Sequence, residues 1–269
     1  MHYIVWALLT ILYSPVLYKL YRGRWHKIDY THAYFILPVS LLLVWQKRHT
    51  LKALILKRPP HHNISGLLLT ISGALMFIFG WRQDYLFIST LSLIPILFGI
   101  TIYLYNDADV KTLSFPILYL LLLVPPPLGV LDSITLPLRY GVSVLTEVIL
   151  KTLNYPINRE GLLLMVEEKE IYMGAPCSGF RSLITMFSLG LAYVYITKRT
   201  AKGIIILLSS IIPLALLGNL IRVVSTCLVA FYFGDAVRTK FHDLSGYAIF
   251  AVLILGLMGI DSLLDKCKI

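Results

Sequence analysis

Long apolar stretches alternate with short polar connections along almost the whole chain. A helix needs about 20 apolar residues to cross the hydrocarbon core of a bilayer, and eight stretches come close to that length. They cover residues 3–20, 30–45, 64–80, 85–105, 113–124, 180–196, 203–233 and 244–264. Because a soluble core does not need so many, the pattern predicts an all-α polytopic membrane protein with about eight transmembrane helices and no separate soluble domain.

Two of these stretches carry further signals. The first begins at Met1 without a basic leader or a small-residue cleavage site, which predicts a retained helix rather than a cleaved signal peptide. The stretch over 203–233 is longer than one crossing requires. We therefore expect it to bend near Pro213 or Gly218.

Basic residues gather in the connections between the apolar stretches. The net charge of +10 arises from 24 Lys and Arg against 14 Asp and Glu, and its placement indicates topology signals rather than nucleic-acid binding. If the loops over 46–62 and 197–202 are cytoplasmic, alternation places both termini inside. The Pro125–Pro127 turn, the stretch leading to Cys177 and the loop at His242 then all lie on the outer side.

One basic segment breaks this pattern. Lys19, Arg22, Arg24 and Lys27 would face outward, against the rule that keeps positive loops inside. Because cations close together attract anions, this segment is a candidate site for anionic lipid or substrate.

The stretch between the fifth and sixth apolar segments has a helical period with two unlike faces. Apolar residues recur at 131, 134, 138, 145, 148, 149 and 153, whereas Asp132, Arg139, Ser143, Glu147 and Lys151 occupy the other face. This predicts an amphipathic helix on the outer membrane interface. A ninth transmembrane span is the alternative, which is disfavoured because the four charged side chains are costly to bury.

Two short runs of strand-compatible residues follow, over 162–166 and 169–173, about a Glu167-Glu168 turn. They predict a small hairpin that leads directly to Cys177, and an ordered extracellular loop fits the same residues equally well. Extended backbone beside a nucleophile would allow a peptide substrate to pair with it as an added strand.

Among three cysteines, only Cys177 is placed for chemistry, because Cys227 lies within an apolar stretch and Cys267 lies near the cytoplasmic end. Pro176 suits the first turn of a helix. We therefore expect Cys177 at the N-terminus of the sixth helix, where unpaired amides and the helix dipole stabilise a thiolate.

Residues just after Cys177 are candidates to support it. Gly179 lets another part of the chain approach closely. Arg181 follows Cys177 by four residues, which would return it to the same helix face and allow it to assist Cys177 electrostatically.

Arg222 lies about one membrane thickness beyond Lys202, so on a straight helix it reaches the outer boundary at the level of Cys177. An arginine in an apolar helix is costly and favours a functional role, with snorkelling to the headgroups as the alternative. Asn219 precedes Arg222 by three residues on the same face, where it could orient the guanidinium, bind substrate or join helices.

His242 is predicted to begin the eighth span, and Asp243 to cap that helix or to fix the imidazole tautomer. The adjacent His61 and His62 lack metal-ligand spacing, so we assign no metal. Cys177, Arg222 and His242 together supply a nucleophile, a charge stabiliser and a proton carrier, which indicates a membrane enzyme.

Three ordered motifs resemble those of the exosortases and archaeosortases. They are Pro176-Cys177-Ser178-Gly179, Asn219-Leu220-Ile221-Arg222, and His242-Asp243 followed by Gly246 and Phe250. The resemblance extends over most of the chain, to Thr31-His32-Ala33-Tyr34-Phe35, Pro38, Trp45, Arg48, Pro125-Pro126 and Gly161.

This resemblance implies a thiol protease and transpeptidase of the prokaryotic plasma membrane, which sorts exported proteins that carry a short motif, a transmembrane helix and a basic tail at the C-terminus. Cys177 would attack the scissile carbonyl to give a thioester, His242 would carry protons, and Arg222 would stabilise developing negative charge or position the substrate. The expected partners are these exported proteins, membrane lipid, and water, an amine or a lipid-linked group as acceptor. No cofactor and no nucleic acid is expected.

We expect a single integral membrane domain in three parts: five helices over 1–127, the amphipathic helix and hairpin over 128–176, and three helices with the catalytic residues over 177–269. The supporting residues would be Ser178, Gly179, Arg181, Asn219 and Asp243. Two rival functions are a transporter for envelope precursors, with Arg222 lining the path, and a transferase for lipid-linked sugars, with the amphipathic helix as a platform.

Overall fold

A computed structural model describes residues 2–25, 30, 32–51, 63–105, 107–127, 129–167, 169–197 and 199–266. Some predictions concern residues outside these ranges, namely Lys27, Thr31, the basic loop over 52–62 with His61 and His62, Glu168, Lys198 and Cys267. Seven helices in the described part are long and apolar enough to cross a membrane, and shorter apolar helices cover Ala33–Gln46 and Val110–Leu123. The prediction of an all-α polytopic membrane protein is confirmed.

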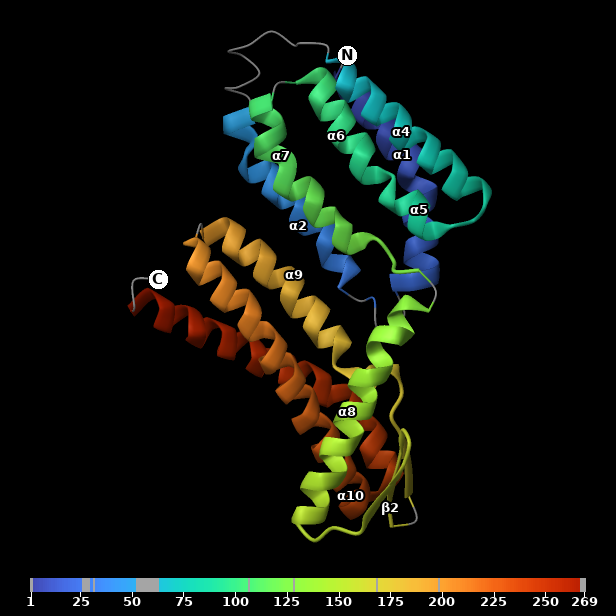
Figure 1. The fold of residues 1–269 in the computed structure, drawn as a ribbon, viewed down its shortest axis with the longest axis vertical. Helices are drawn as coiled ribbons and strands as arrows, with labels where there is room; N and C mark the ends of the chain where they lie inside the picture. The colour runs from blue at the N-terminus through green and yellow to red at the C-terminus, as the bar shows by residue number, and fades with distance from the viewer. Residues whose placement is uncertain are drawn as a thin grey trace. The chain divides into compact units, whose positions relative to one another are not determined.

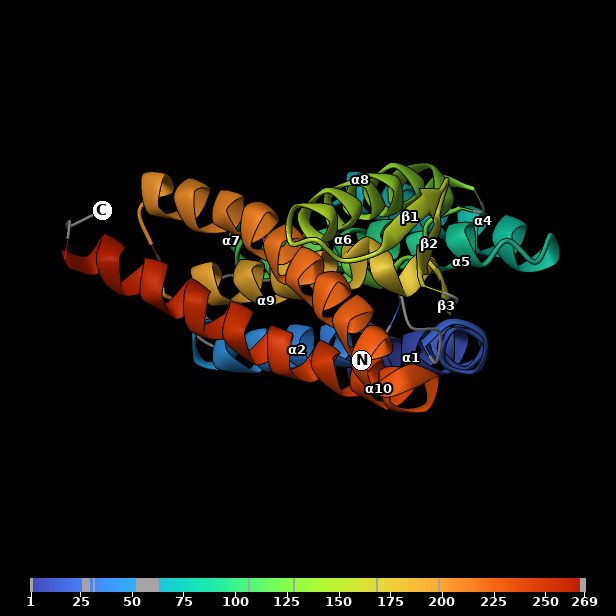
Figure 2. The same cartoon turned by 90° about the horizontal axis from the view of Figure 1, so that it is seen from below.

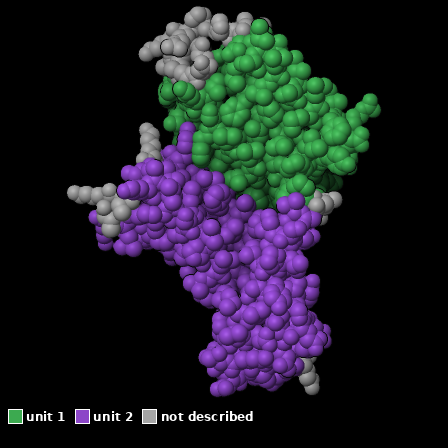
Figure 3. All heavy atoms as spheres, in the orientation of Figure 1, with its two compact units in different colours: residues 1–127 green, residues 128–269 purple. Residues whose placement is uncertain are grey.

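The chain forms two compact units, residues 1–127 and 128–269 (Figure 3). The first unit is built from apolar helices and short helical turns (Figure 1). They are α1 (His2–Leu20), η1 (Tyr21–Trp25), α2 (Ala33–Gln46), α4 (Ile64–Arg82), α5 (Leu86–Leu91), α6 (Leu93–Leu104), α7 (Asp107–Tyr119) and η3 (Leu120–Leu123).

Helices α4 and α6 pack closely because glycines lie where they meet. A Cβ atom on Gly66 would lie only 2.5 Å from the backbone nitrogen of Tyr103, and one on Gly99 would lie 2.4 Å from Thr70 Oγ1. Without strong hydrophobic attraction between helices in lipid, such close backbone contact supplies the packing energy.

The basic segment that begins at Lys19 is partly engaged within its own unit. Lys19 Nζ lies 2.6 Å from Asp84 Oδ1 and 4.3 Å from the centre of the Trp81 ring, and Arg22 Nε donates to the Tyr18 hydroxyl at 3.1 Å. Binding of anionic lipid or substrate here stays a prediction.

The second unit combines helices with a small sheet (Figure 1). In chain order it contains α8 (Val130–Thr152), β1 (Ile157–Glu160), β2 (Leu163–Val166), β3 (Lys169–Tyr172), the short 3-10 helix η4 (Ala175–Ser178), α9 (Phe180–Thr197) and α10 (Ala201–Lys266). Apolar side chains from α8, the sheet, η4 and α10 form one buried cluster that includes Cys177.

Helix α8 has the two predicted faces, and the middle of its polar face turns inward while Asp132 and Lys151 stay exposed. Arg139 and Ser143 are buried in the second unit, whereas Leu145 and Val148 are half exposed. This orientation is the one expected for a helix surrounded by lipid. Polar groups are costly in contact with hydrocarbon, so they face the protein interior, where they can find partners, and apolar side chains face the lipid. By length and composition α8 also qualifies as a membrane span, so both the interfacial and the spanning alternatives stay open.

The predicted hairpin is present as part of a three-stranded antiparallel sheet with the order β1-β2-β3. Leu163 pairs with Tyr172 and Val166 with Lys169 across the predicted turn, and Glu167 adopts a positive φ of 56° there. Strand β1 was not predicted, because its residues Ile157–Glu160 are mostly polar and give no apolar alternation.

Helix α10 is two helices joined at Gly234, which has φ 78° and ψ 179°. We call residues 201–233 the first arm and residues 235–266 the second arm; Figure 2 shows the chain reversing direction between them. The backbone leaves helical angles at Gly234, after the stretch in which a bend near Pro213 or Gly218 was expected, and that bend stays a prediction. Glycine permits this turn because it has no Cβ atom to clash at positive φ.

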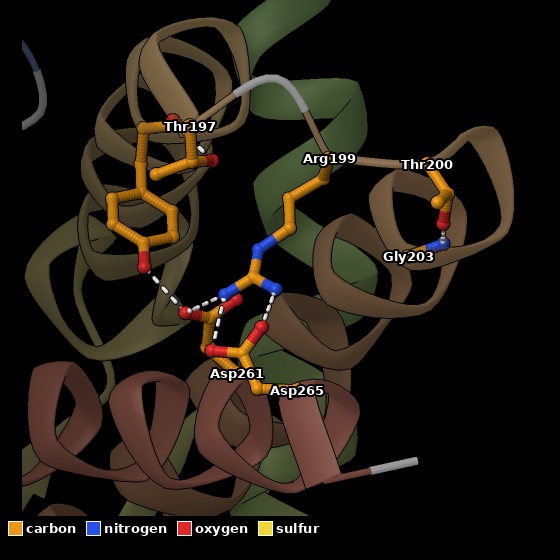
Figure 4. Close-up of polar contacts among 7 residues, drawn as sticks. Thr197, Arg199, Thr200, Gly203, Asp261 and Asp265 are labelled. Carbon is orange, nitrogen blue, oxygen red and sulfur yellow. Dashed lines mark hydrogen bonds and ion pairs between the residues drawn. The ribbon is translucent and has the colours of Figure 1, made fainter. Parts of the chain in front are cut away.

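A charged cluster joins the loop after α9 to the far end of the second arm (Figure 4). The guanidinium of Arg199 bonds Asp261 Oδ2 at 2.6 Å and also bonds Asp265, and the Tyr193 hydroxyl donates to Asp261. Because Arg199 and Asp261 are largely buried, losing one partner would leave a buried charge, which is strongly destabilising.

Candidate functional site

Cys177 lies in η4, before α9 begins at Phe180. Gly179 separates the two elements with a left-handed φ of 74°, so the chain does not continue as one helix through Cys177. Cys177 was predicted at the N-terminus of the sixth helix, and the structure places it in a separate turn three residues before that helix begins. Arg181 consequently does not share a helix face with Cys177, and the spacing argument for its assistance fails.

Hydrogen bonds within the turn hold Cys177 in place. The Cys177 amide donates to the Gly174 carbonyl at 3.0 Å. The Ser178 hydroxyl donates to the Ala175 carbonyl at 2.8 Å and accepts the Phe180 amide at 3.2 Å. Ser178 thus closes η4 and satisfies a free amide at the start of α9, where a helix lacks internal partners.

His242 meets Cys177 although 65 residues separate them in the sequence. The Cys177 Sγ atom lies 3.8 Å from His242 Nε2, which is within hydrogen-bonding distance for sulfur. His242 is eight residues past Gly234, inside the second arm, and lies two residues before the apolar segment Leu244–Lys266, close to the predicted start of the eighth span. Asp243 also lies inside that helix, so it cannot be its N-cap; its side chain lies outside the described part of the chain.

Two side chains of the first arm bond the backbone around Cys177. Arg222 Nη2 donates to the Pro176 carbonyl, and Asn219 Nδ2 donates to the Cys177 carbonyl at 2.7 Å. The predicted proximity of Arg222 and Asn219 to Cys177 is thus present in the structure. Both contacts fix the turn that carries the sulfur, since they bond the carbonyls of two successive residues.

The close approach of Asn219 depends on Gly179. A Cβ atom at Gly179 would lie 2.9 Å from Asn219 Cβ, closer than such atoms normally come. The positive φ of Gly179 also disfavours any other residue. A side chain at this position would displace Asn219 from the Cys177 carbonyl.

A pocket of about 280 Å³ opens beside the sulfur. Its lining comes from β3 and the following turn, from η4 and from both arms of α10: Ile171, Tyr172, Met173, Gly174, Pro176, Cys177, Val223, Thr226, Arg238, Thr239 and His242. Tyr172, Arg238 and Thr239 were not among the predicted site residues. Arg238 precedes His242 by four residues, and that helical spacing was the signal that could have found it.

The electrostatic environment of Cys177 differs from the expected one. Burial raises the pKa of the Cys177 thiol, and the positive charge of Arg222 opposes this shift, with smaller contributions from Arg238 and Arg139. The predicted stabilisation of a thiolate is therefore outweighed, and the thiol form is favoured in the unliganded site. Arg181 instead acts electrostatically on Arg222.

No group of three or more His, Cys, Asp or Glu side chains in the described ranges is arranged to hold a metal ion. A comparison with protein-family models matches residues 25–259 to the transmembrane exosortase family (Exosortase_EpsH). Searches of curated proteins and of solved structures gave no match.

Proposed function

The chain belongs to the transmembrane exosortase family, a group of membrane transpeptidases and proteases, and we infer that it cleaves C-terminal sorting signals of exported proteins through Cys177. The observation that carries this proposal is the 3.8 Å approach of Cys177 Sγ to His242 Nε2 beside an open pocket. A thiol and an imidazole at this distance form the nucleophile and base pair of a cysteine protease.

The reaction proceeds in two halves. Cys177 Sγ attacks the scissile carbonyl carbon while its proton passes to His242 Nε2, and His242 then delivers that proton to the departing amine as the C–N bond breaks. The resulting thioester is opened by water, an amine or a lipid-linked group. The acceptor's proton passes to His242 and then to sulfur, which restores the thiol.

The raised pKa of the Cys177 thiol makes His242 necessary, because proton transfer to the imidazole generates the thiolate as the substrate binds. Arg222 supports this step in two ways. Its charge favours the thiolate, and its bond to the Pro176 carbonyl holds the turn that aims the sulfur.

The free edge of β3 offers a place for the substrate backbone. In the described residues β3 pairs with β2 alone. The Met173 amide donates to the Leu162 carbonyl at 2.8 Å, so in this antiparallel ladder the backbone groups of Glu170 and the amide of Tyr172 point to the outer edge, while the Tyr172 carbonyl accepts the Gly174 amide at 3.0 Å. A peptide that adds to this edge as a strand would run into the pocket at Cys177.

A transmembrane helix on the substrate also favours cleavage at this site. Anchoring the substrate in the same bilayer raises its effective concentration at the pocket without requiring large contacts. We place the site at the extracytoplasmic face of a prokaryotic plasma membrane, with both termini cytoplasmic.

Mass spectrometry of C-terminal peptides tests the proposal. Exported proteins from cells carrying the native enzyme are compared with those from cells carrying Cys177→Ala; Cys227→Ala is the matched control because Cys227 is buried but does not line the pocket. We expect a set of proteins to keep its C-terminal helix and basic tail only in Cys177→Ala cells. Identical profiles from equally expressed enzymes would remove Cys177 from the mechanism and favour a transporter.

A further inference from the structure

Two arginines of α10 lie near Cys177 and differ in what they bond. Arg222, on the first arm, donates from Nη2 to the Pro176 carbonyl and does not line the pocket beside Cys177. Arg238, on the second arm, lines the pocket together with Cys177 and His242. The two side chains therefore have different access to a bound substrate.

Arg238 retains most of its donors for an occupant of the pocket. Its Nε donates to Asp235 Oδ1 at 2.7 Å, and its side chain is 25% exposed. In the described parts of the chain, its two Nη groups have no hydrogen-bond partner. A guanidinium carries five N–H donors, so a fixed Nε leaves a pair of Nη groups that can bind an oxygen atom.

The position of Arg238 follows from the helix that carries it. His242 lies four residues later on the same face, which places the two Cβ atoms about 5–6 Å apart. Asp235, at the start of the second arm, holds the Nε side of the guanidinium. A substrate carbonyl between Cys177 Sγ and the second arm would thus meet the imidazole and the guanidinium together.

We propose that Arg238 donates hydrogen bonds to the substrate carbonyl oxygen as it becomes an oxyanion, and that Arg222 is a positioning residue that holds the nucleophile turn. This inference rests on the proposed function. As the C–S bond forms, the carbonyl π electrons move to oxygen, and Arg238 stabilises that charge. When the C–N bond breaks, the carbonyl re-forms and Arg238 is unchanged.

Alkylation of Cys177 tests the anion-binding part without any substrate. The purified full chain is treated with anionic iodoacetate or neutral iodoacetamide, and modification of the Cys177 peptide is followed by mass spectrometry. The ratio of the two rates cancels the thiolate fraction, because both reagents attack the thiolate. It therefore reports the charge presented to a bound anion.

We expect Arg238→Gln to lower the iodoacetate-to-iodoacetamide ratio several-fold and Arg238→Lys to lower it less, since lysine keeps the charge but loses the planar fork. Lys240→Gln is the matched control: it removes one positive charge from the same arm at an exposed position that does not line the pocket. Its ratio should stay native. A native ratio in Arg238→Gln would overturn the proposal, and continued iodoacetamide labelling shows that the pocket is intact.

The catalytic part of the proposal is tested by kinetics, with a substrate identified from the comparison of native and Cys177→Ala cells. Loss of one oxyanion donor lowers kcat by about 10² to 10³-fold, so we expect Arg238→Gln to lose kcat with KM little changed. A change confined to KM would make Arg238 a substrate anchor and overturn the oxyanion role. Native processing by Arg238→Gln would defeat this inference alone, whereas processing by Cys177→Ala would defeat the proposed function itself.

Discussion

At the scale of single residues, burial and positive charge act on the Cys177 sulfur in opposite directions. Burial raises the pKa of the thiol, so the thiolate fraction at neutral pH is small and increases as the pH rises through the elevated pKa. Since only the thiolate is alkylated, we expect the iodoacetamide rate at Cys177 to rise with pH and to reach half its maximum above the pH usual for cysteine. Removing the opposing charge in Arg222→Met should move this midpoint to still higher pH.

Arg222→Lys is the control, because it keeps a positive charge while losing the planar geometry. Its midpoint should stay close to that of the native protein. A midpoint that is equally displaced in both variants would show that the bond to the Pro176 carbonyl, rather than the charge, sets the reactivity of Cys177.

The residues predicted from the sequence are polar groups within apolar stretches. Burying such a group costs free energy, so its presence indicates a role even without a structure. Asn219 and Arg222 find their hydrogen-bond partners in the turn that carries Cys177, so the three residues lie together in the fold. Arg238 was missed because it lies in a polar segment, three residues after Asp235. In the sequence, such a pair looks like an ordinary ion pair on a solvated surface. Only the reversal of the chain before it brings Arg238 to the pocket.

At the scale of elements, the apolar stretches located most of the helices and their ends, for example 180–196 against α9 at Phe180–Thr197, but not the glycine turns beside the site. Helical periodicity carries no information on where backbone angles change, so the sequence did not show that Cys177 lies in a separate turn before α9 or that the second arm begins before His242. Both boundaries depend on glycines with positive φ, Gly179 and Gly234. A lone glycine in an apolar run is also compatible with an unbroken helix, which is why the sequence did not identify these breaks.

The break at Gly234 leaves the last carbonyls of the first arm without helical partners, and Lys169 of β3 bonds two of them. Its Nζ lies 2.7 Å from the Ala230 carbonyl and 3.2 Å from the Phe231 carbonyl. We expect Lys169→Met to lower stability by about 1 kcal/mol, as for loss of a hydrogen bond, and to lower the melting temperature in detergent by a few degrees.

Lys169→Arg is the matched variant, since it can still donate to both carbonyls. It should retain most of the native melting temperature. Equal losses in the methionine and arginine variants would indicate that packing of the lysine stem, rather than its hydrogen bonds, stabilises the break.

At the scale of the whole molecule, the hydrophobic pattern predicted the class of fold because bilayer thickness sets the length of every spanning helix. It could not predict how helices pair, since lipid-facing and protein-facing apolar residues look alike in sequence. The close packing of α4 on α6 depends on Gly66 and Gly99, whose role becomes visible only when both helices are in place. The placement of Cys177 beside His242 likewise depends on packing over 65 intervening residues.

The proposed orientation of the chain in the membrane rests on charge and can be measured. Arg199 between α9 and α10 and Lys202 in the first turn of α10 favour the cytoplasmic side, and alternation would then place the sheet outside with Cys177. In a chain with its native cysteines replaced by serine, we expect Asn158→Cys in β1 to react with a membrane-impermeant maleimide in intact cells. Ala201→Cys, at the start of α10, should react only after permeabilisation, and the opposite pattern would place the pocket on the cytoplasmic side, where an exported substrate could not reach it.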